Sequence, residues 1–167
     1  KLFLKVNRKK TEVAHISTVK YLGYSFYRHK GKCRFRVHPK SVAKMKNRIR
    51  ELTDRNKGIS NEVREKKYQE YVRGWVEYFR LADMKKLLQK TDEWARRRIR
   101  AVYWKQWKKI KTKCRMLKAL GLEDWKAKEL ANSRKGYWRM AKVLNQIFSN
   151  KIIAKLGYTS VSYTHLR

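Results

Sequence analysis

The spacing of apolar residues changes at Pro39, the only proline in the chain. Before it, apolar and polar residues alternate over 1–7 and 33–37, and residues 19–27 form a run rich in β-branched and aromatic side chains. Alternation with a period of two is typical of β-strands. After Pro39 the period lengthens to about 3.6 residues, which is typical of amphipathic helices. The sequence therefore predicts β structure over 1–37, too little to bury a core alone, followed by helices.

Three amphipathic helices joined by short polar turns are predicted next. Their starts are Ser41 as an N-cap, Ser60 or Asn61, and Asp83 as an N-cap, and Gly58 is expected to end the first helix. The apolar stripes of the three helices comprise Val42, Met45, Ile49 and Leu52; Val63, Tyr68, Tyr71, Val72, Trp75, Phe79 and Ala82; and Met84, Leu87, Leu88, Thr91, Trp94, Ala95, Ile99, Val102 and Tyr103. Stripes of this kind face one another in a helical bundle.

Gly74 interrupts the second predicted helix, where glycine costs about 1 kcal/mol relative to alanine. A glycine at such a position indicates either that another backbone packs close by or that the helix tolerates an imperfection there. From Thr112 onward, shorter helices are predicted over 117–122, 125–131, 138–148 and 151–157. The expected fold is mainly α, with a short N-terminal β-hairpin part, a three-helix bundle and further short helices. The expected segments are 1–37, 38–111, 112–158 and a tail, 159–167, without assigned function.

The charge of the chain is strongly unbalanced, with 46 Lys and Arg against 13 Asp and Glu, a net charge of +33. Such an excess repels itself and indicates a polyanionic partner. Disorder is the other common outcome of high charge. The apolar fraction of 42% and the 6 Trp, 10 Tyr and 5 Phe residues argue instead for a folded chain.

The third predicted helix carries the densest cationic face, with few acidic residues to balance it. Cations interleaved with aromatic rings suit phosphate neutralisation combined with stacking on bases. The predicted phosphate contacts are Arg96, Arg97, Arg100, Lys105 and Lys108, with Arg73, Arg134 and Arg139 as further nucleic-acid contacts and Trp104 and Trp107 as rings that either stack on bases or belong to the core. An arginine beside a helical tryptophan, such as Arg73 or Arg139, can also simply lie over the ring.

The residue pattern provides no active site. A polymerase or nuclease needs clustered carboxylates for two metal ions, and the adjacent pairs Asp92-Glu93 and Glu123-Asp124 diverge by about 100° on a helix. Cys33 and Cys114 are not in a zinc-binding pattern, so neither a metal site nor a cofactor is predicted. A basic helical protein can also lie on an anionic membrane, but apolar stripes spread over several helices favour a bundle, and no membrane partner is expected.

Several short motifs, taken in order, resemble the C-terminal part of bacterial group II intron reverse transcriptase/maturases. They are 4–11 (LKVNRKKT), 19–24 (VKYLGY), 48–53 (RIRELT), 73–79 (RGWVEYF), 92–94 (DEW), 96–100 (RRRIR) and 104–108 (WKQWK). The first two resemble the end of the palm, and the others resemble the maturase-specific thumb, or X domain. The resemblance extends from Lys1 to about Tyr158, whereas 160–167 (SVSYTHLR) departs from the family pattern.

The resemblance implies a fragment of a larger protein that binds its own intron RNA, assists splicing and copies the RNA by target-primed reverse transcription. The implied partners are group II intron RNA, the RNA/DNA template–primer duplex, target DNA, and the palm and fingers of the same protein. The family's catalytic Tyr-Ala-Asp-Asp, with its Mg²⁺, is expected upstream of Lys1, so this part binds rather than catalyses. Leu22, Gly23 and Tyr24 fall where the family has its primer grip, and a bacterial cytoplasmic location is expected.

One alternative stays open from the sequence. A stand-alone basic RNA-binding module of the ribosomal-protein type would share the charge and the helices. It would give no reason for an N-terminal set of strands without a partner sheet.

Overall fold

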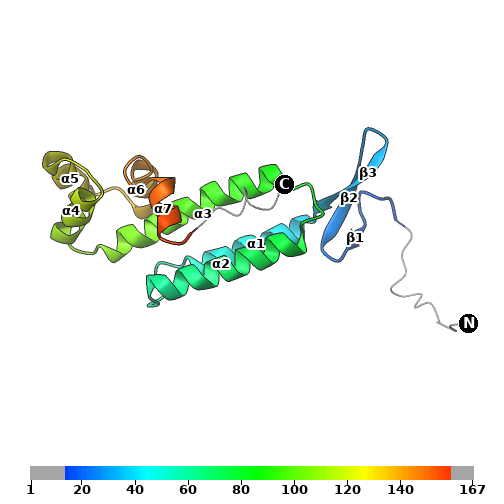
Figure 1. Cartoon of the computed structure of the whole chain (residues 1–167), viewed down its shortest axis with the longest axis horizontal. Helices are drawn as coiled ribbons and strands as arrows, with labels where there is room; N and C mark the ends of the chain where they lie inside the picture. Colours follow the sequence, from blue (N-terminus) through cyan, green and yellow to red (C-terminus); the bar gives the residue numbers. More distant parts are fainter. Residues whose placement is uncertain (1–13, 159–167) are drawn as a thin grey trace, which may run out of the picture.

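The structure is a computed structural model that describes residues 14–158. The strand predicted over 1–7 and the tail 159–167 lie outside the described residues. Figure 1 shows an elongated molecule, with a small sheet at one end, three long helices along its length and short helices gathered at the other end.

The sheet is antiparallel and contains three strands in sequence order among the described residues. They are β1 (Lys20–Tyr21), β2 (Tyr24–His29) and β3 (Lys32–Val37). Two-residue turns at Leu22-Gly23 and Lys30-Gly31 connect them, with φ values of +48° and +85° in the first turn and +49° and +75° in the second. Positive φ at both central residues matches the right-handed twist of a hairpin. The β-rich run 19–27 thus contains a turn at Leu22-Gly23, where the resemblance placed the primer-grip hairpin.

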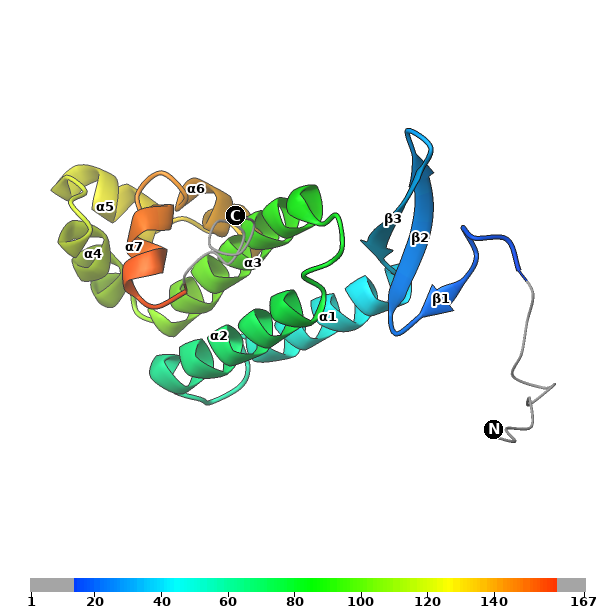
Figure 2. The ribbon, with the colours of Figure 1, turned by 45° about the vertical axis from the view of Figure 1, so that its right-hand side comes forward.

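The helices confirm the expected mainly α fold. The long helices are α1 (Pro39–Leu52), α2 (Asn61–Tyr78) and α3 (Lys85–Gln106), and the shorter ones are α4 (Ile110–Ala119), α5 (Asp124–Ala131), α6 (Tyr137–Val143) and α7 (Asn150–Lys155). Figure 2 shows α1 and α2 running side by side below α3, with α6 and α7 against the second half of α3.

The predicted N-cap of α1 is wrong. His38 caps this helix, because its Nδ1 accepts the N–H of Lys40 at 3.1 Å, and Pro39 occupies the first turn, where it needs no hydrogen-bond partner. Ser41 lies one turn later and donates its hydroxyl to the carbonyl of Gly23. The helix ends at Leu52, well before Gly58. For α2 the expectation was correct, since the Ser60 hydroxyl accepts the N–H of Val63.

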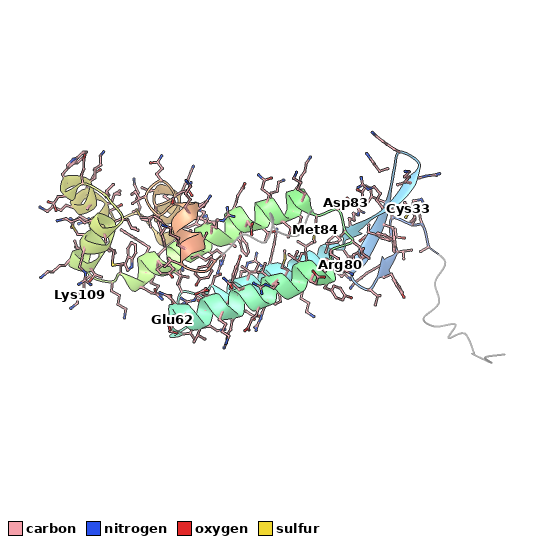
Figure 3. All side chains as sticks on the ribbon, viewed as in Figure 1. Cys33, Glu62, Arg80, Asp83, Met84 and Lys109 are labelled. Carbon is pink, nitrogen blue, oxygen red and sulfur yellow. The ribbon has the colours of Figure 1, made fainter. Side chains whose placement is uncertain are left out.

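Asp83 does not cap α3, contrary to the prediction. The capping residue is Met84, which has no side-chain cap bond. The Asp83 carboxylate instead accepts a hydrogen bond from the Tyr27 hydroxyl at 2.6 Å and pairs with Arg34 at 2.8 Å. The backbone N–H of Asp83 donates to the carbonyl of Phe35. Figure 3 shows Asp83 where the loop before α3 meets the sheet, so this residue joins the strands to the helical bundle.

One continuous core runs through the helices. The predicted stripes supply most of it, including the buried residues Met45, Ile49, Leu52, Tyr68, Val72, Leu88, Ala95 and Ile99, and the short helices extend it with Leu117, Met140, Leu144, Phe148 and Ile153. Gly74 does not contribute, because it is exposed and a Cβ at its position would meet nothing within 4 Å. Of the two alternatives for Gly74, the close-packed backbone is therefore wrong among the described residues, and the tolerated imperfection fits.

Candidate nucleic-acid interface

Helix α3 is the element around which the cationic side chains are arranged. Its residues Glu93, Arg96, Arg97 and Arg100 lie three and four positions apart and so share one face of the helix. That face borders a pocket of about 370 Å³, whose other lining residues are Ala141, Lys142, Asn145 and Asn150. The cationic face predicted for α3 is thus partly covered by α6 and by the segment that leads into α7.

Arg100 is an internal anchor rather than a surface cation. It is 3% exposed, its Nε donates to the carbonyl of Phe148 at 2.8 Å, and its Nη2 donates to Asn150 Oδ1 at 2.7 Å. Burial, with a smaller contribution from Arg96, lowers the pKa of Arg100 to about 10, so the group stays charged at neutral pH. The geometry assigns Arg100 to holding the start of α7 against α3, not to a phosphate.

Arg96 and Arg97 also have partners within the protein. Arg96 pairs with Asp92 one helical turn away, at 3.4 Å. Arg97 donates from Nε and Nη2 to the carbonyl of Trp138, at 3.2 and 2.9 Å, and its guanidinium lies 4.0 Å from the centre of the Trp138 ring. Arg97 therefore brings the start of α6 against α3.

Arg98 points to the other side of α3, and its contacts were not predicted. Its Nε donates to Thr53 Oγ1 at 2.7 Å, and its Nη2 reaches the carbonyl of Arg50 at 3.3 Å. Burial lowers the pKa of Arg98 first, and the charges of Arg50 and Arg55 lower it further. Arg98 therefore fastens α3 to the end of α1, where the helix dipole is negative.

A second pocket, of about 280 Å³, lies where the α1–α2 loop, α3 and α6 meet. It is lined by Thr53, Asp54, Arg55, Arg98, Ala101 and Trp138. Arg55 lies over the ring of Tyr137, with its guanidinium 4.9 Å from the ring centre. Residues Tyr137 and Trp138 nevertheless remain 41% and 43% exposed.

We call Arg55, Arg97, Arg98, Tyr137 and Trp138 the arginine–aromatic cluster. Two parts of this surface were anticipated separately, namely Arg97 in the cationic face of α3 and the predicted contacts Arg134 and Arg139, which flank Tyr137 and Trp138 in the sequence. The contribution of the α1–α2 loop through Arg55 was missed, because nothing in the local sequence indicates that this loop folds against Tyr137. The structure joins three segments distant in sequence into one cationic, aromatic surface.

The two tryptophans at the end of α3 belong to the core. Trp104 and Trp107 are both buried, and their rings meet edge to face at 6.0 Å. The ring of Trp107 also packs near Phe148, and Lys113 covers Trp104. Of the two roles considered from the sequence, the burial favours packing and leaves neither ring face open to a base.

The remaining cations predicted to contact nucleic acid differ in whether they have a partner within the protein. Lys105 donates to Asn56 Oδ1. The side chains of Arg73, Lys108, Arg134 and Arg139 are exposed, and within 14–158 they have no hydrogen-bond or ion-pair partner. These four are the predicted cations that remain available to an external anion.

The predicted primer-grip residues form the first hairpin turn, and the turn is fixed to the helices. The carbonyl of Leu22 accepts the Tyr78 hydroxyl at 3.0 Å, and the carbonyl of Gly23 accepts the Ser41 hydroxyl at 3.1 Å. A Cβ on Gly23 would lie 2.9 Å from Ser41 Oγ, so glycine is required there for space as well as for its φ. The Tyr24 hydroxyl donates to the carbonyl of Tyr78, which completes the link to α2.

Beside this turn the sheet presents an apolar surface. A pocket of about 380 Å³ is lined by Tyr21, Leu22, Tyr24, Phe26, Phe35 and Leu81. Tyr21, Leu22 and Leu81 are more than half exposed, which is uncommon for neighbouring large apolar side chains.

Residues 14–158 provide no helix with the length and apolar character needed to cross a bilayer. In the same part of the chain, no group of three or more His, Cys, Asp and Glu side chains is arranged to hold a metal ion.

Comparison with known proteins identifies a family that matches the central part of the chain. Residues 42–121 match the family model described as the maturase-specific domain of group II introns. The match begins within α1 and ends at Gly121, directly after α4, and so includes the whole of α2 and α3. A search of curated proteins found no match.

Proposed function

We propose that the chain binds group II intron RNA directly and supports its splicing. The premise is the match of residues 42–121 to the group II intron maturase-specific domain, which fits the C-terminal maturase region of an intron-encoded reverse transcriptase/maturase. The observation that carries the proposal is the surplus of unpaired cations on the surface. The net charge is +33, since 46 Lys and Arg residues face 13 Asp and Glu, so most of the cations have no carboxylate to pair with. Phosphates neutralise such a surface and release counterions as they bind.

The proposal extends to the template–primer duplex and to target DNA, because both present the same phosphate backbone. The rigid turn at Leu22-Gly23 supports a primer-grip role, since a turn fixed to the helices can hold a primer end in place. The exposed apolar surface around Tyr21 and Leu81 supports packing against the palm of the same protein. In this proposal the Mg²⁺ ions and the catalytic carboxylates belong to that palm, and the protein acts in the bacterial cytoplasm.

The test is the affinity of the chain for a group II intron RNA and for an unrelated structured RNA of equal length, each measured across a range of salt concentrations. A preference for the intron RNA that persists at high salt is expected. Equal affinities that fall together with salt would reduce the function to counterion release alone, as expected for a generic basic RNA-binding module. Absence of binding to either RNA would overturn the proposal.

A pair of double variants identifies the surface. Arg134→Gln/Arg139→Gln removes two exposed cations without protein partners and should lower the slope of log affinity against log salt by about two. Lys126→Gln/Lys128→Gln is the matched control, because both lysines already pair with carboxylates, Glu123 and Asp124. Equal effects of the two double variants would show that phosphates do not select the unpaired cations.

A further inference from the structure

We propose that the pocket between the α1–α2 loop, α3 and α6 binds one unpaired nucleotide of an RNA, with its base on the Trp138 or Tyr137 ring and its phosphate at Arg55 and Arg98. This inference rests on the proposed function, because it takes the ligand to be RNA. It goes further by assigning the chemical form of the ligand and the residues that recognise it.

The pocket holds more positive charge than its carboxylate can balance. Arg55 and Arg98 line it, and the guanidinium of Arg97 lies over the Trp138 ring. Burial lowers the pKa of Arg98, and the nearby charge of Arg50 lowers it further. The carboxylate that lines the pocket belongs to Asp54, and its Oδ1 accepts the N–H of Asn56. The guanidinium groups gathered around one carboxylate repel each other, and an incoming phosphate would reduce this repulsion.

Tyr137 and Trp138 combine partial exposure with guanidinium groups over their rings, which distinguishes this place from the buried tryptophans of α3. Guanidinium groups cover parts of the Tyr137 and Trp138 rings, yet more than two fifths of each residue stays open. Trp94, Trp104 and Trp107, by contrast, are packed among protein side chains. Open rings held in place by arginines are suited to stacking on a base.

The size and composition of the pocket favour a single unpaired nucleotide over other partners. A volume of about 280 Å³ admits one small planar group. A base inside a duplex is stacked on its neighbours and cannot reach such a ring, whereas a bulged or loop base can. An acidic peptide would supply charge for the arginines but no planar group for Trp138, and the experiment separates these cases.

The experiment uses the full chain and one RNA hairpin in three forms. In the first form 2-aminopurine is unpaired as a bulge, in the second it is paired with uridine, and in the third an abasic residue replaces it. Stacking quenches 2-aminopurine, so binding of the wild-type chain should reduce the fluorescence of the bulged form but not that of the paired form. The bulged form should also bind at least about five-fold more tightly than the abasic form.

Variants then assign the effect to the pocket. Trp138→Leu should remove both the quenching and the preference for the bulged form while leaving affinity for the paired hairpin unchanged, and Trp138→Phe should restore part of each. Trp125→Leu is the matched control, because Trp125 is 60% exposed on α5 and its indole N–H donates to Glu123 rather than facing an arginine cluster. Arg55→Gln should weaken the bulged form more than the paired form and tests the phosphate end without altering a ring.

Each outcome decides between the two proposals. Quenching that persists in Trp138→Leu, or that is lost equally in Trp125→Leu, would overturn the nucleotide pocket. Equal binding of all three hairpins without quenching would overturn it too, while leaving RNA binding intact. If polyglutamate displaced the RNA from wild-type protein but not from Arg55→Gln, an acidic peptide would be the better ligand. Failure to bind any of the hairpins would overturn both proposals.

Discussion

Replacing Arg64 by methionine tests whether a buried arginine in this strongly cationic chain serves the fold. Arg64 lies in the first turn of α2 and is 1% exposed. Its Nε donates to the carbonyl of Leu52 at 3.2 Å, Nη1 to Asn61 Oδ1 at 3.0 Å, and Nη2 to the carbonyls of Asp54 and Lys57 at 3.4 and 3.3 Å. No carboxylate in the described part of the chain pairs with it, so carbonyl dipoles at the end of α1 and in the loop that follows balance the charge.

The expected loss follows from these contacts. Hydrogen bonds to a charged group contribute about 1.5–3 kcal/mol each when measured singly, but four bonds from one side chain are not additive. Water can reach the carbonyls of Asp54 and Lys57 in the loop more easily than that of Leu52, which reduces the loss. Removing a buried charge also recovers some desolvation energy. We therefore expect Arg64→Met to lower the free energy of unfolding by about 2–4 kcal/mol.

The assay is urea denaturation followed by circular dichroism, with RNA affinity measured on the folded variant. Arg73→Met is the control on the same helix, because Arg73 is exposed and has no partner within 14–158. Arg64→Met should change stability with little change in RNA affinity, and Arg73→Met should do the reverse. A stability change below about 0.5 kcal/mol for Arg64→Met would refute the structural role, since surface substitutions already produce changes of that size.

Two further substitutions, at Gly74 and Trp104, test positions where the structure decides between alternatives that the sequence left open. Gly74→Ala should raise the free energy of unfolding by about 0.5–1 kcal/mol in urea denaturation, because the Cβ meets open space in the middle of α2, and a loss of stability would contradict this. Trp104→Phe should lower the thermal midpoint through a loss of about 1–3 kcal/mol while RNA affinity stays constant, and weaker RNA binding at full stability would return Trp104 to the interface.

The long helices could be predicted because their information is local. Residues such as Met45, Ile49 and Leu52 recur at the helical period, and the same residues face the core in the structure. The repeat depends only on neighbouring positions, so it can be read without knowing what packs against it.

The junctions between elements could not be predicted in the same way. Asp83 has the residue type and the position of an N-cap, yet its carboxylate is taken by Tyr27 and Arg34, more than 45 residues earlier in the chain. Gly74 has the residue type of a close-packing site, yet its side of α2 is open. In both cases the outcome depends on a tertiary contact, or its absence, that local spacing does not encode.

At the candidate site, the roles of the arginines could not be predicted from local sequence either. The sequence cannot distinguish an arginine that binds phosphate from one that binds a backbone carbonyl, because both lie in cationic, aromatic segments. In the structure Arg97, Arg98 and Arg100 all donate to carbonyls of other segments, so the densest cationic stretch of α3 is largely used to assemble the bundle. If the proposed function holds, RNA binds at the edges of α3, where Arg55 and the segment 134–139 add cations and partly exposed aromatic residues that α3 alone does not expose.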